Sequence, residues 1–434
     1  MTNVPMTRPG EMLAMHEQNY GHSVAFIGLD GGRILETNGA DFLYSDDGGI
    51  TWSEPYRGSD DDGELASVSC ASLVNLDGGA IGLAEMRWRP GSTSRYETQM
   101  VFRTSEDQGH TWSPPVVMND CLLRAHALQD VMIRTSSGRI ILPVYLVVGQ
   151  GTWHEEGKPF VGGYLNGNFV STDGHFIDPH FCASYVVYSD DEGATWQPNS
   201  DGELFILREL AGPAEGAPEP SIVEVTPGRL MMIVRTGLGR LFQAWSDDNG
   251  ETWSRFQPTQ LAGTQAPGQL RKLPGTGHLL AVWTQQSEAE IRRGFIRTRL
   301  SAAISRNGGG LWEHFYNVES LHEQTHVEPG PIYRVRPEGA YGVHAGTAAQ
   351  ENDANYIVPL PEGYGRWSYP SVFVAEDRVL ISHSYSVHDS VTGEVINPGA
   401  NRLKVLPISW FYGGDDPSRE SILLDKLETQ APKP

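Results

Sequence analysis

Cysteine, long apolar segments, positive charge and helical patterns are all scarce in this 434-residue protein, and each scarcity excludes some classes of protein. It has only 3 cysteines, Cys70, Cys121 and Cys182, and their spacing fits neither a disulfide framework nor a metal-binding motif, so we expect them to be reduced. No segment is apolar enough to cross a membrane, and residues 1–20 lack the apolar core of a secretory signal. The sequence therefore predicts a cytoplasmic protein.

Positive charge is also scarce. The chain has 32 Lys and Arg against 54 Asp and Glu, a formal net charge of −22. Long-range repulsion opposes the approach of nucleic acids and anionic membranes, so we expect neither as a partner. A local group of arginines can still reverse the potential inside one cleft, so an acidic substrate is compatible with this composition.

Helical patterns are nearly missing, apart from a short amphipathic stretch at 418–427. What the chain has instead is a repeated phrase, Ser-x-Asp-x-Gly-x-Thr-Trp, called the Asp box below. Its copies begin at Ser45, Ser105, Ser189, Ser246 and Ser305, and the last is degenerate because Asn307 and Leu311 replace the aspartate and the threonine. Regular recurrence of this kind is typical of a repeat architecture.

Each Asp box follows an alternating apolar stretch and is predicted to form a hairpin turn. Its aspartate can accept hydrogen bonds from the turn's own backbone, and its glycine supplies the positive φ that other residues resist. Its tryptophan lies in the next strand, where it can pack between neighbouring sheets. We therefore interpret the five boxes as scaffold rather than as catalytic or metal-binding aspartates.

Upstream of each box, and once more after the last one, two alternating strands are joined by a tight turn. The predicted strand pairs are 23–27 with 33–35, 72–75 with 80–84, 131–134 with 139–145, 221–225 with 229–235, 269–273 with 278–283, and 371–375 with 378–385. Six such units of four strands predict an all-β fold, a six-bladed β-propeller of four-stranded antiparallel blades with Asp-box turns. We expect one domain over 1–434, with an N-terminal arm at 1–20 and a tail from about 414 to 434.

A six-unit array with Asp boxes resembles the sialidase (neuraminidase) superfamily over nearly the whole chain. The segment Glu219-Pro220-Ser221 resembles the strand head that carries a glutamate in that family, and Arg235 stands where a carboxylate-binding arginine is kept. Arg297 matches another such arginine, with Arg299 as its nearest competitor. Tyr369, in Trp367-Ser368-Tyr369-Pro370, stands at the place of the nucleophilic tyrosine. The resemblance thus implies that Glu219 polarises Tyr369 and that Arg235 and Arg297 bind the substrate carboxylate.

The chain departs from the family pattern in its first unit. His22 stands where the first arginine of the family belongs. In the family, a longer loop in this unit carries the acid/base aspartate. The corresponding segment is short here, and only Asp41 or Glu36 could replace that aspartate. Because a histidine titrates near neutrality, His22 is predicted to act as the acid or base.

Further residues are candidates for substrate contact. Arg87, before an inter-strand loop of the second unit, and His126, at the start of the third, are predicted to bind substrate. An insertion at 149–180 mixes aromatic and polar residues in a way that suits sugar binding, whereas its irregular spacing of histidines and acids favours a metal less. We predict no cofactor and no metal, and the sequence does not indicate an oligomeric state.

Three functions follow from these residues. The first is an exo-acting glycoside hydrolase of sialidase type that releases a terminal acidic sugar, with Tyr369 and Glu219 as the nucleophile pair and His22 as the proton donor. The second is a polysaccharide lyase or other uronate-directed enzyme with a His/Tyr pair, in which arginines neutralise the uronate. The third is a propeller that binds glycans without catalysis. The match to Glu219, Arg235, Arg297 and Tyr369 favours the first.

Overall fold

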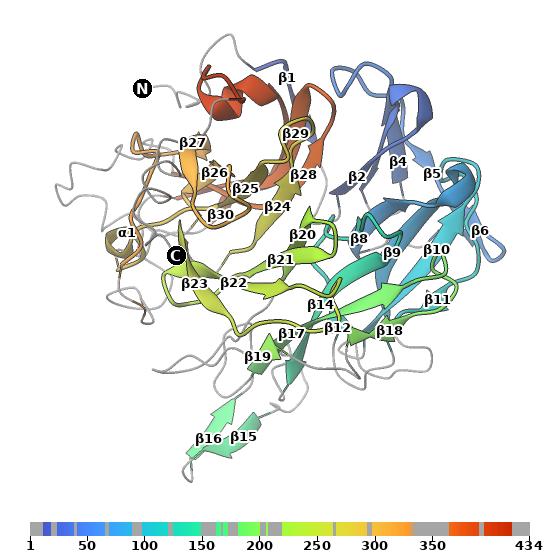
Figure 1. Ribbon diagram of the computed structural model, residues 1–434, viewed down its shortest axis with the longest axis horizontal. Coiled ribbons are helices and arrows are strands. Elements are labelled where there is room, and N and C mark those ends of the chain that lie inside the picture. The colour runs from blue at the N-terminus through green and yellow to red at the C-terminus, as the bar shows by residue number, and fades with distance from the viewer. Residues whose placement is uncertain are drawn as a thin grey trace, which may run out of the picture.

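The fold is known from a computed structural model, which describes residues 12–18, 24–38, 41–65, 69–88, 98–119, 125–148, 162–165, 168–171, 181–199, 205–206, 219–263, 266–292, 297–330, 332, 364–389 and 395–418. Six sheets of four or more antiparallel strands are arranged around a central axis (Figure 1). This confirms the predicted six-bladed propeller. The six predicted strand pairs are also confirmed, with ends shifted by a few residues.

The first three blades follow one another along the chain. Blade 1 consists of β2 (Val24–Gly28), β3 (Ile34–Asn38), β4 (Asp41–Ser45) and β5 (Tyr56–Arg57). Blade 2 consists of β8 (Ser69–Asn75), β9 (Ile81–Trp88), β10 (Thr98–Ser105) and β11 (Val116–Val117). Blade 3 has split inner and outer strands and consists of β12 (Ala125–His126), β13 (Ile133–Arg134), β14 (Ile140–Val148), β17 (Phe181–Ser189), β18 (Gln197–Pro198) and β19 (Phe205–Ile206).

The last three blades complete the ring. Blade 4 consists of β20 (Ser221–Thr226), β21 (Arg229–Val234), β22 (Arg240–Ser246) and β23 (Gln257–Ala262). Blade 5 consists of β24 (Gly268–Lys272), β25 (Leu279–Thr284), β26 (Arg299–Ser305) and β27 (Glu313–Ser320). Blade 6 consists of β28 (Tyr364–Val374), β29 (Arg378–His388), β30 (Val395–Pro407) and β1 (Ala14–Gln18).

Shorter elements lie between the blade strands or beside them. They are β6 (Ser59–Asp60), β7 (Gly63–Glu64), β15 (Gly162–Leu165), β16 (Asn168–Ser171), the α-helix α1 (Glu288–Arg292) and the 3-10 helices Asp30–Gly32, Asp77–Gly79 and Ile408–Tyr412. The hairpin of β15 and β16 belongs to the predicted insertion and projects from the ring (Figure 1). No helix among the described residues is long and apolar enough to cross a lipid bilayer.

The two ends of the described chain meet in blade 6. β1 pairs antiparallel with β30, so that Ala14 lies opposite Val405 and Gln18 opposite Asn401. The predicted N-terminal arm therefore contributes the outermost strand of the last blade. Because an isolated edge strand has unpaired backbone groups, this pairing closes the ring by hydrogen bonds and satisfies both strands.

The Asp boxes form the hydrogen bonds that their sequence predicted. In the first box, the Ser45 hydroxyl donates to Asp47 Oδ1 over 2.8 Å, and the Gly49 amide donates to Ser45 Oγ over 2.8 Å. The backbone amide and the hydroxyl of Thr51 donate to the two carboxylate oxygens of Asp47 over 2.9 and 2.6 Å. Gly49 has a φ of 89°, which a residue with a Cβ adopts only with strain.

The degenerate fifth box keeps the turn but loses one bond. Its Asn307 accepts hydrogen bonds from Ser305 Oγ over 3.0 Å and from the Leu311 amide over 2.8 Å. Leu311 has no hydroxyl, so the side-chain bond made by threonine in the other copies has no counterpart. The backbone bonds therefore suffice for the turn.

The box tryptophans pack against the preceding blade. Trp112 of blade 2 stacks on Phe42 of blade 1 with ring centroids 5.4 Å apart, and Trp196 of blade 3 lies against Phe102 of blade 2 at 5.1 Å. Apolar surface is thus buried between neighbouring sheets, which confirms the predicted structural role of the boxes.

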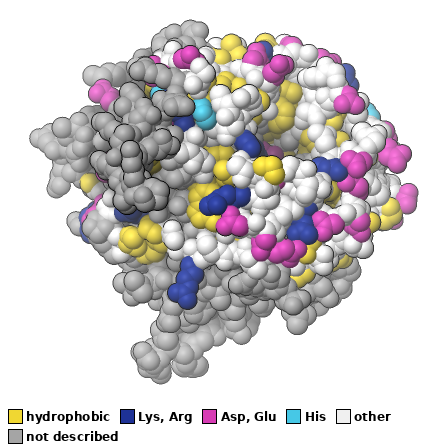
Figure 2. All heavy atoms as spheres, in the orientation of Figure 1, with side chains coloured by type: hydrophobic (Ala, Val, Ile, Leu, Met, Phe, Trp, Pro, Cys, Tyr) yellow, Lys and Arg dark blue, Asp and Glu magenta, His cyan; other side chains and the backbone are white. Residues whose placement is uncertain are grey.

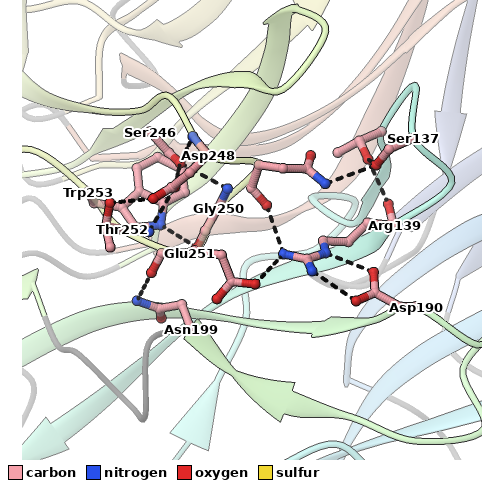
Figure 3. Close-up of polar contacts among 12 residues, drawn as sticks. Ser137, Arg139, Asp190, Asn199, Ser246, Asp248, Gly250, Glu251, Thr252 and Trp253 are labelled. Carbon is pink, nitrogen blue, oxygen red and sulfur yellow. Dashed lines mark hydrogen bonds and ion pairs between the residues drawn. The ribbon is translucent and has the colours of Figure 1, made fainter.

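An arginine ties blade 3 to the Asp box of blade 4 (Figure 3). The Arg139 guanidinium holds both carboxylate oxygens of Asp190 in its own blade, each at 2.8 Å. It also donates to Glu251 Oε1 over 2.7 Å and to the Asn249 carbonyl over 3.2 Å in the next blade. The planar donor fork suits such bidentate contacts.

On the face shown in Figure 2, acidic side chains gather toward the right-hand half, and several basic side chains lie directly beside them. The excess of acidic side chains fits the net charge of −22, and several arginines of the described ranges, such as Arg33, Arg139 and Arg402, form ion pairs.

Candidate active site

Glu219 lies just before β20, the inner strand of blade 4, and Tyr369 lies at a bulge within β28, the inner strand of blade 6. Both precede a proline, and both have positive φ, 57° for Glu219 and 55° for Tyr369. In blade 6 the pairing register of β28 shifts between Ser368 and Ser371, so the Tyr369-Pro370 pair bulges out of the ladder. Cys70, at a register shift in the inner strand of blade 2, has a similar φ of 56°, so this backbone conformation recurs in the fold and the side-chain contacts identify the site.

The two side chains meet across the hub. The Tyr369 hydroxyl donates to Glu219 Oε1 over 3.1 Å. Arg235, which follows β21, places Nη1 2.8 Å from Glu219 Oε2 and donates to the Tyr369 hydroxyl oxygen over 3.3 Å. Glu219 and Arg235 are only 6% and 4% exposed, so this contact lies where water screens charges weakly.

Arg297 approaches Tyr369 from blade 5. Its guanidinium carbon lies 5.1 Å from the Tyr369 ring centroid, within the range of a cation–π contact. Nη1 donates to Ser368 Oγ over 3.3 Å, and the Arg297 carbonyl accepts a bond from the Trp367 amide over 2.7 Å. The structure thus brings together all four residues that the resemblance placed in units four to six.

The competing arginine is excluded by burial. Arg299 is 1% exposed and forms an ion pair with Glu290 of α1 at 2.8 Å. The same glutamate lies 3.2 Å from His322 Nε2, so Arg299 belongs to a buried polar cluster inside blade 5. Arg297, two residues earlier, is the one that reaches Tyr369.

The electrostatics of the cluster keep the phenol neutral. Burial raises the pKa of Tyr369, and the neighbouring Glu219 charge raises it further, whereas Arg235 and Arg297 oppose the shift. Tyr369 therefore stays protonated at pH 7 and can lose its proton most readily to the Glu219 oxygen that already accepts its hydrogen bond.

The other predicted contacts lie apart from these bonds. Arg87, at the end of β9, is held by an ion pair between its Nε and Glu85 Oε1 at 2.5 Å. His126 is 6% exposed, and its ring stacks on Tyr145 with centroids 5.6 Å apart. Substrate binding by either stays a prediction. His22 lies outside the described residues, as does most of the insertion at 149–180.

The two acidic candidates of the first unit are engaged elsewhere. Asp41 pairs with Arg57 on the outer strand of blade 1 at 2.6 Å. Glu36 is completely buried, and the Gln18 amide of β1 donates to both its oxygens over 3.2 Å. Both carboxyl groups are thus held by structural contacts, and a role for either as the proton donor stays a prediction. The contact of Glu36 joins blade 1 to the closing strand.

Glu36→Gln is expected to stabilise the protein increasingly as pH rises. Burial raises the pKa of Glu36 from 4.5 to about 8, so the unfolded chain loses this proton at lower pH than the folded one. The wild type therefore loses stability between about pH 4.5 and pH 8, and the neutral glutamine removes that loss, on the order of 4 kcal/mol at pH 8. The buried Gln18 Oε1, which lacks a hydrogen-bond partner, gains a donor from the new amide.

Urea unfolding of both forms at pH 5 and pH 8 measures this difference. Asp41→Asn, which alters a half-exposed carboxylate of the same blade, serves as the control and should show no comparable pH trend. An equal stability difference at the two pH values would contradict the neutral state of Glu36.

The sequence carried a signal for this site that extends beyond the resemblance. Glu219 and Tyr369 are each followed by Pro-Ser, and each serine bonds to the neighbouring inner strand: Ser221 Oγ accepts from the Leu270 amide over 3.1 Å, and Ser371 Oγ donates to the Val24 carbonyl over 2.6 Å. Ser368, in contrast, has no such signature and was not predicted. Within the described ranges, no three His, Cys, Asp or Glu side chains come together as a metal site.

Comparison with known proteins places this chain in a family of repeat proteins. Residues 43–381 match the model of a family described as a BNR repeat-like domain. The chain is 24% identical over 307 residues to an anhydrosialidase of Macrobdella decora, an alignment that covers 68% of this chain and 33% of that protein. The chain thus spans about a third of the length of that curated relative.

Solved structures share the fold at low identity. A protein of unknown function from Dyadobacter fermentans has a TM-score of 0.54 and 17% identity, with 92% of this chain and all of that chain covered. The sialidase of Trypanosoma rangeli in complex with the inhibitor DANA has a TM-score of 0.53 and 13% identity, with 92% of this chain and 56% of that chain covered. At these identities the likeness shows the propeller fold.

Proposed function

This chain belongs to the family of BNR repeat-like domains and is a divergent member of the sialidase superfamily, and we propose that it is an exo-acting glycoside hydrolase that releases a terminal acidic sugar from glycans. The observation that carries this proposal is the contact of Tyr369, Glu219 and Arg235, three residues from two blades joined by bonds of 2.8 to 3.3 Å. Arg297 adds a second cation beside the same phenol.

The geometry suits a sugar that carries a carboxylate on its anomeric carbon. A carboxylate nucleophile would be repelled by such a substrate, whereas a neutral phenol would not. Arg235 and Arg297 would hold the substrate carboxylate through their planar forks. The Tyr369 oxygen would then form a bond to the anomeric carbon while its proton passes to Glu219 Oε1.

The remaining steps balance the reaction. As the tyrosyl–sugar bond forms, the glycosidic carbon–oxygen bond breaks and the leaving oxygen takes a proton from an acid, for which we propose His22. In the second half, water attacks the anomeric carbon and gives its proton to His22, the tyrosyl–sugar bond breaks, and the phenol recovers its proton from Glu219. The products are the free acidic sugar and the shortened glycan.

The proposal is tested with the full chain on two kinds of substrate. Fluorogenic sialosides report hydrolysis, and a panel of uronate polysaccharides followed by ultraviolet absorbance reports the unsaturated product of a lyase. We expect fluorophore release without a rise in ultraviolet absorbance. A rise with the polysaccharides would assign the Tyr369 cluster to a lyase, and binding of glycans without turnover of either kind would make the chain a non-catalytic propeller.

A further inference from the structure

The backbone of Tyr369 is held in a conformation that its own sequence disfavours. Its φ of 55° lies in the left-handed region, where a bulky side chain is strained. Pro370 adds to the strain, because the residue before a proline is pushed toward extended conformations. Such a conformation persists only when neighbouring groups fix it.

Two buried glutamines hold the backbone around Tyr369 in this conformation. Gln129, from the loop between β12 and β13 of blade 3, donates from Nε2 to the Tyr369 carbonyl over 3.1 Å. Gln269, on β24 of blade 5, accepts a bond from the Val372 amide at its Oε1 over 3.0 Å. Its Nε2 donates to the Gln129 carbonyl over 2.8 Å. The two side chains thus hold the bulge on both sides of Pro370.

The loop that carries Gln129 is itself anchored. The backbone amide of the next residue, Asp130, donates to the Ala71 carbonyl of blade 2 over 2.7 Å. Its carboxylate accepts from the Phe26 amide of blade 1 over 3.4 Å and from Arg271 of blade 5 over 2.8 Å. Residues 129–130 therefore contact four other blades, which leaves Gln129 little freedom to follow Tyr369 if the bulge relaxes.

We propose that Gln129 and Gln269 are positioning residues that aim the Tyr369 hydroxyl at Glu219. Gln129 is 4% exposed and Gln269 is completely buried, so both act through Tyr369 rather than on substrate. A buried amide is costly unless its bonds are made, and the three bonds described join Gln129 to Tyr369, Gln269 to Val372, and Gln269 to the Gln129 backbone. The inference rests on the proposed function of Tyr369.

The kinetic test uses Gln129→Met and Gln269→Met, which keep the side-chain volume and remove the hydrogen bonds. We expect kcat to fall about 10- to 100-fold, because a displacement of about 1 Å at the reacting atom has an effect of this size, while KM changes less than about threefold. Asn119→Leu is the matched control. It removes a buried amide that bonds the Met100 backbone over 2.9 Å in blade 2, and it should lower stability without lowering kcat.

A crystal structure of a variant tests this inference independently of the proposed function. In a crystal structure of Gln129→Met we expect residue 369 at negative φ and its hydroxyl no longer bonded to Glu219. A φ near 55° with the 3.1 Å bond retained would overturn the positioning role, whether or not the wild type turns over sialosides. If the wild type is inactive on every substrate, the proposed function fails, and the crystal structure still shows whether Gln129 positions Tyr369.

Gln129→Glu provides a second variant should the methionine forms not fold. The introduced carboxyl group can donate to the Tyr369 carbonyl when it is protonated, whereas its ionised form has no proton to donate. We therefore expect kcat of this variant, relative to wild type, to fall as pH rises through the pKa of the new carboxyl. A pH profile parallel to that of the wild type would contradict the proposal.

Discussion

Tyr369→Phe is expected to lower kcat/KM by about 10³-fold or more, the scale on which loss of a nucleophile acts in hydrolases. The substitution removes one oxygen atom and keeps the ring, so the cation–π contact with Arg297 and the packing of the ring are retained. What is lost is the hydroxyl that donates to Glu219 over 3.1 Å. Steady-state kinetics on the sialoside identified for the wild type, together with thermal unfolding, measure both consequences.

The matched control is Tyr56→Phe. The Tyr56 hydroxyl donates to the Gln108 carbonyl over 2.6 Å between blades 1 and 2, apart from the hub. This variant should keep wild-type kinetics while it loses a hydrogen bond. Unchanged turnover by Tyr369→Phe would remove Tyr369 from the chemistry and leave the cluster with a structural role.

The propeller could be predicted from sequence because its determinants are local. The bonds between Ser45, Asp47, Gly49 and Thr51 close within a few residues, so the phrase alone specifies the turn. Recurrence of the phrase then marks five of the six blades. Blade 6, which has no box, was found through its strand pair instead, and its fourth strand was not assigned because β1 comes from the other end of the chain.

The core of the site could also be predicted, because Glu219, Arg235, Arg297 and Tyr369 follow the order in which the sialidase superfamily keeps such residues. The contacts of the residues around this core could not be predicted. Whether Arg297 or Arg299 faces the hub depends on the pairing of Arg299 with Glu290, a contact made by the short helix α1.

Two further contacts could not be predicted. In the sequence, Glu36 is a candidate acid. In the structure it is buried and bonded to Gln18 of the closing strand, which stands 18 residues earlier in the chain. Gln129 has no distinguishing neighbours in sequence, yet it contacts a carbonyl 240 residues away. Contacts of this range arise from ring closure, and a pattern read along the chain does not contain them.

The seam between blades 5 and 6 contains the charge cluster on which stability should depend most. Glu319 of β27 lies 2.9 Å from Lys404 Nζ and 2.7 Å from Arg402 Nη1, both on β30. Lys404 is completely buried, as is His383 on β29, which lies 3.7 Å from Glu319. Arg402 continues outward to Glu17 of the closing strand at 2.7 Å, so the cluster also secures β1.

Glu319→Ala is expected to lower the free energy of unfolding at pH 7 by about 3–5 kcal/mol, because it leaves the buried Lys404 ammonium without its counter-charge. Glu17→Ala is the matched control: Glu17 binds the same arginine but is 48% exposed, and its loss should cost less than about 1 kcal/mol. Denaturant unfolding measures both. Equal effects of the two substitutions would contradict the assignment of the stabilising charge to Glu319.

The same charge cluster determines whether the free energy of unfolding rises or falls with pH. Burial raises the pKa of Glu319, but Lys404 and Arg402 beside it outweigh burial and lower the pKa overall, so its stabilising charge is present above pH 4.5 and is lost as pH falls through the lowered folded-state value. Burial lowers the pKa of His383 from 6.5 to about 4, so below about pH 6.5 the unfolded state gains a proton that the folded state does not. Both groups make the wild type less stable in acid. The deficit of Glu319→Ala relative to wild type should therefore be largest near neutral pH and should shrink as Glu319 is protonated, and a deficit that grows in acid would show that another group controls the seam.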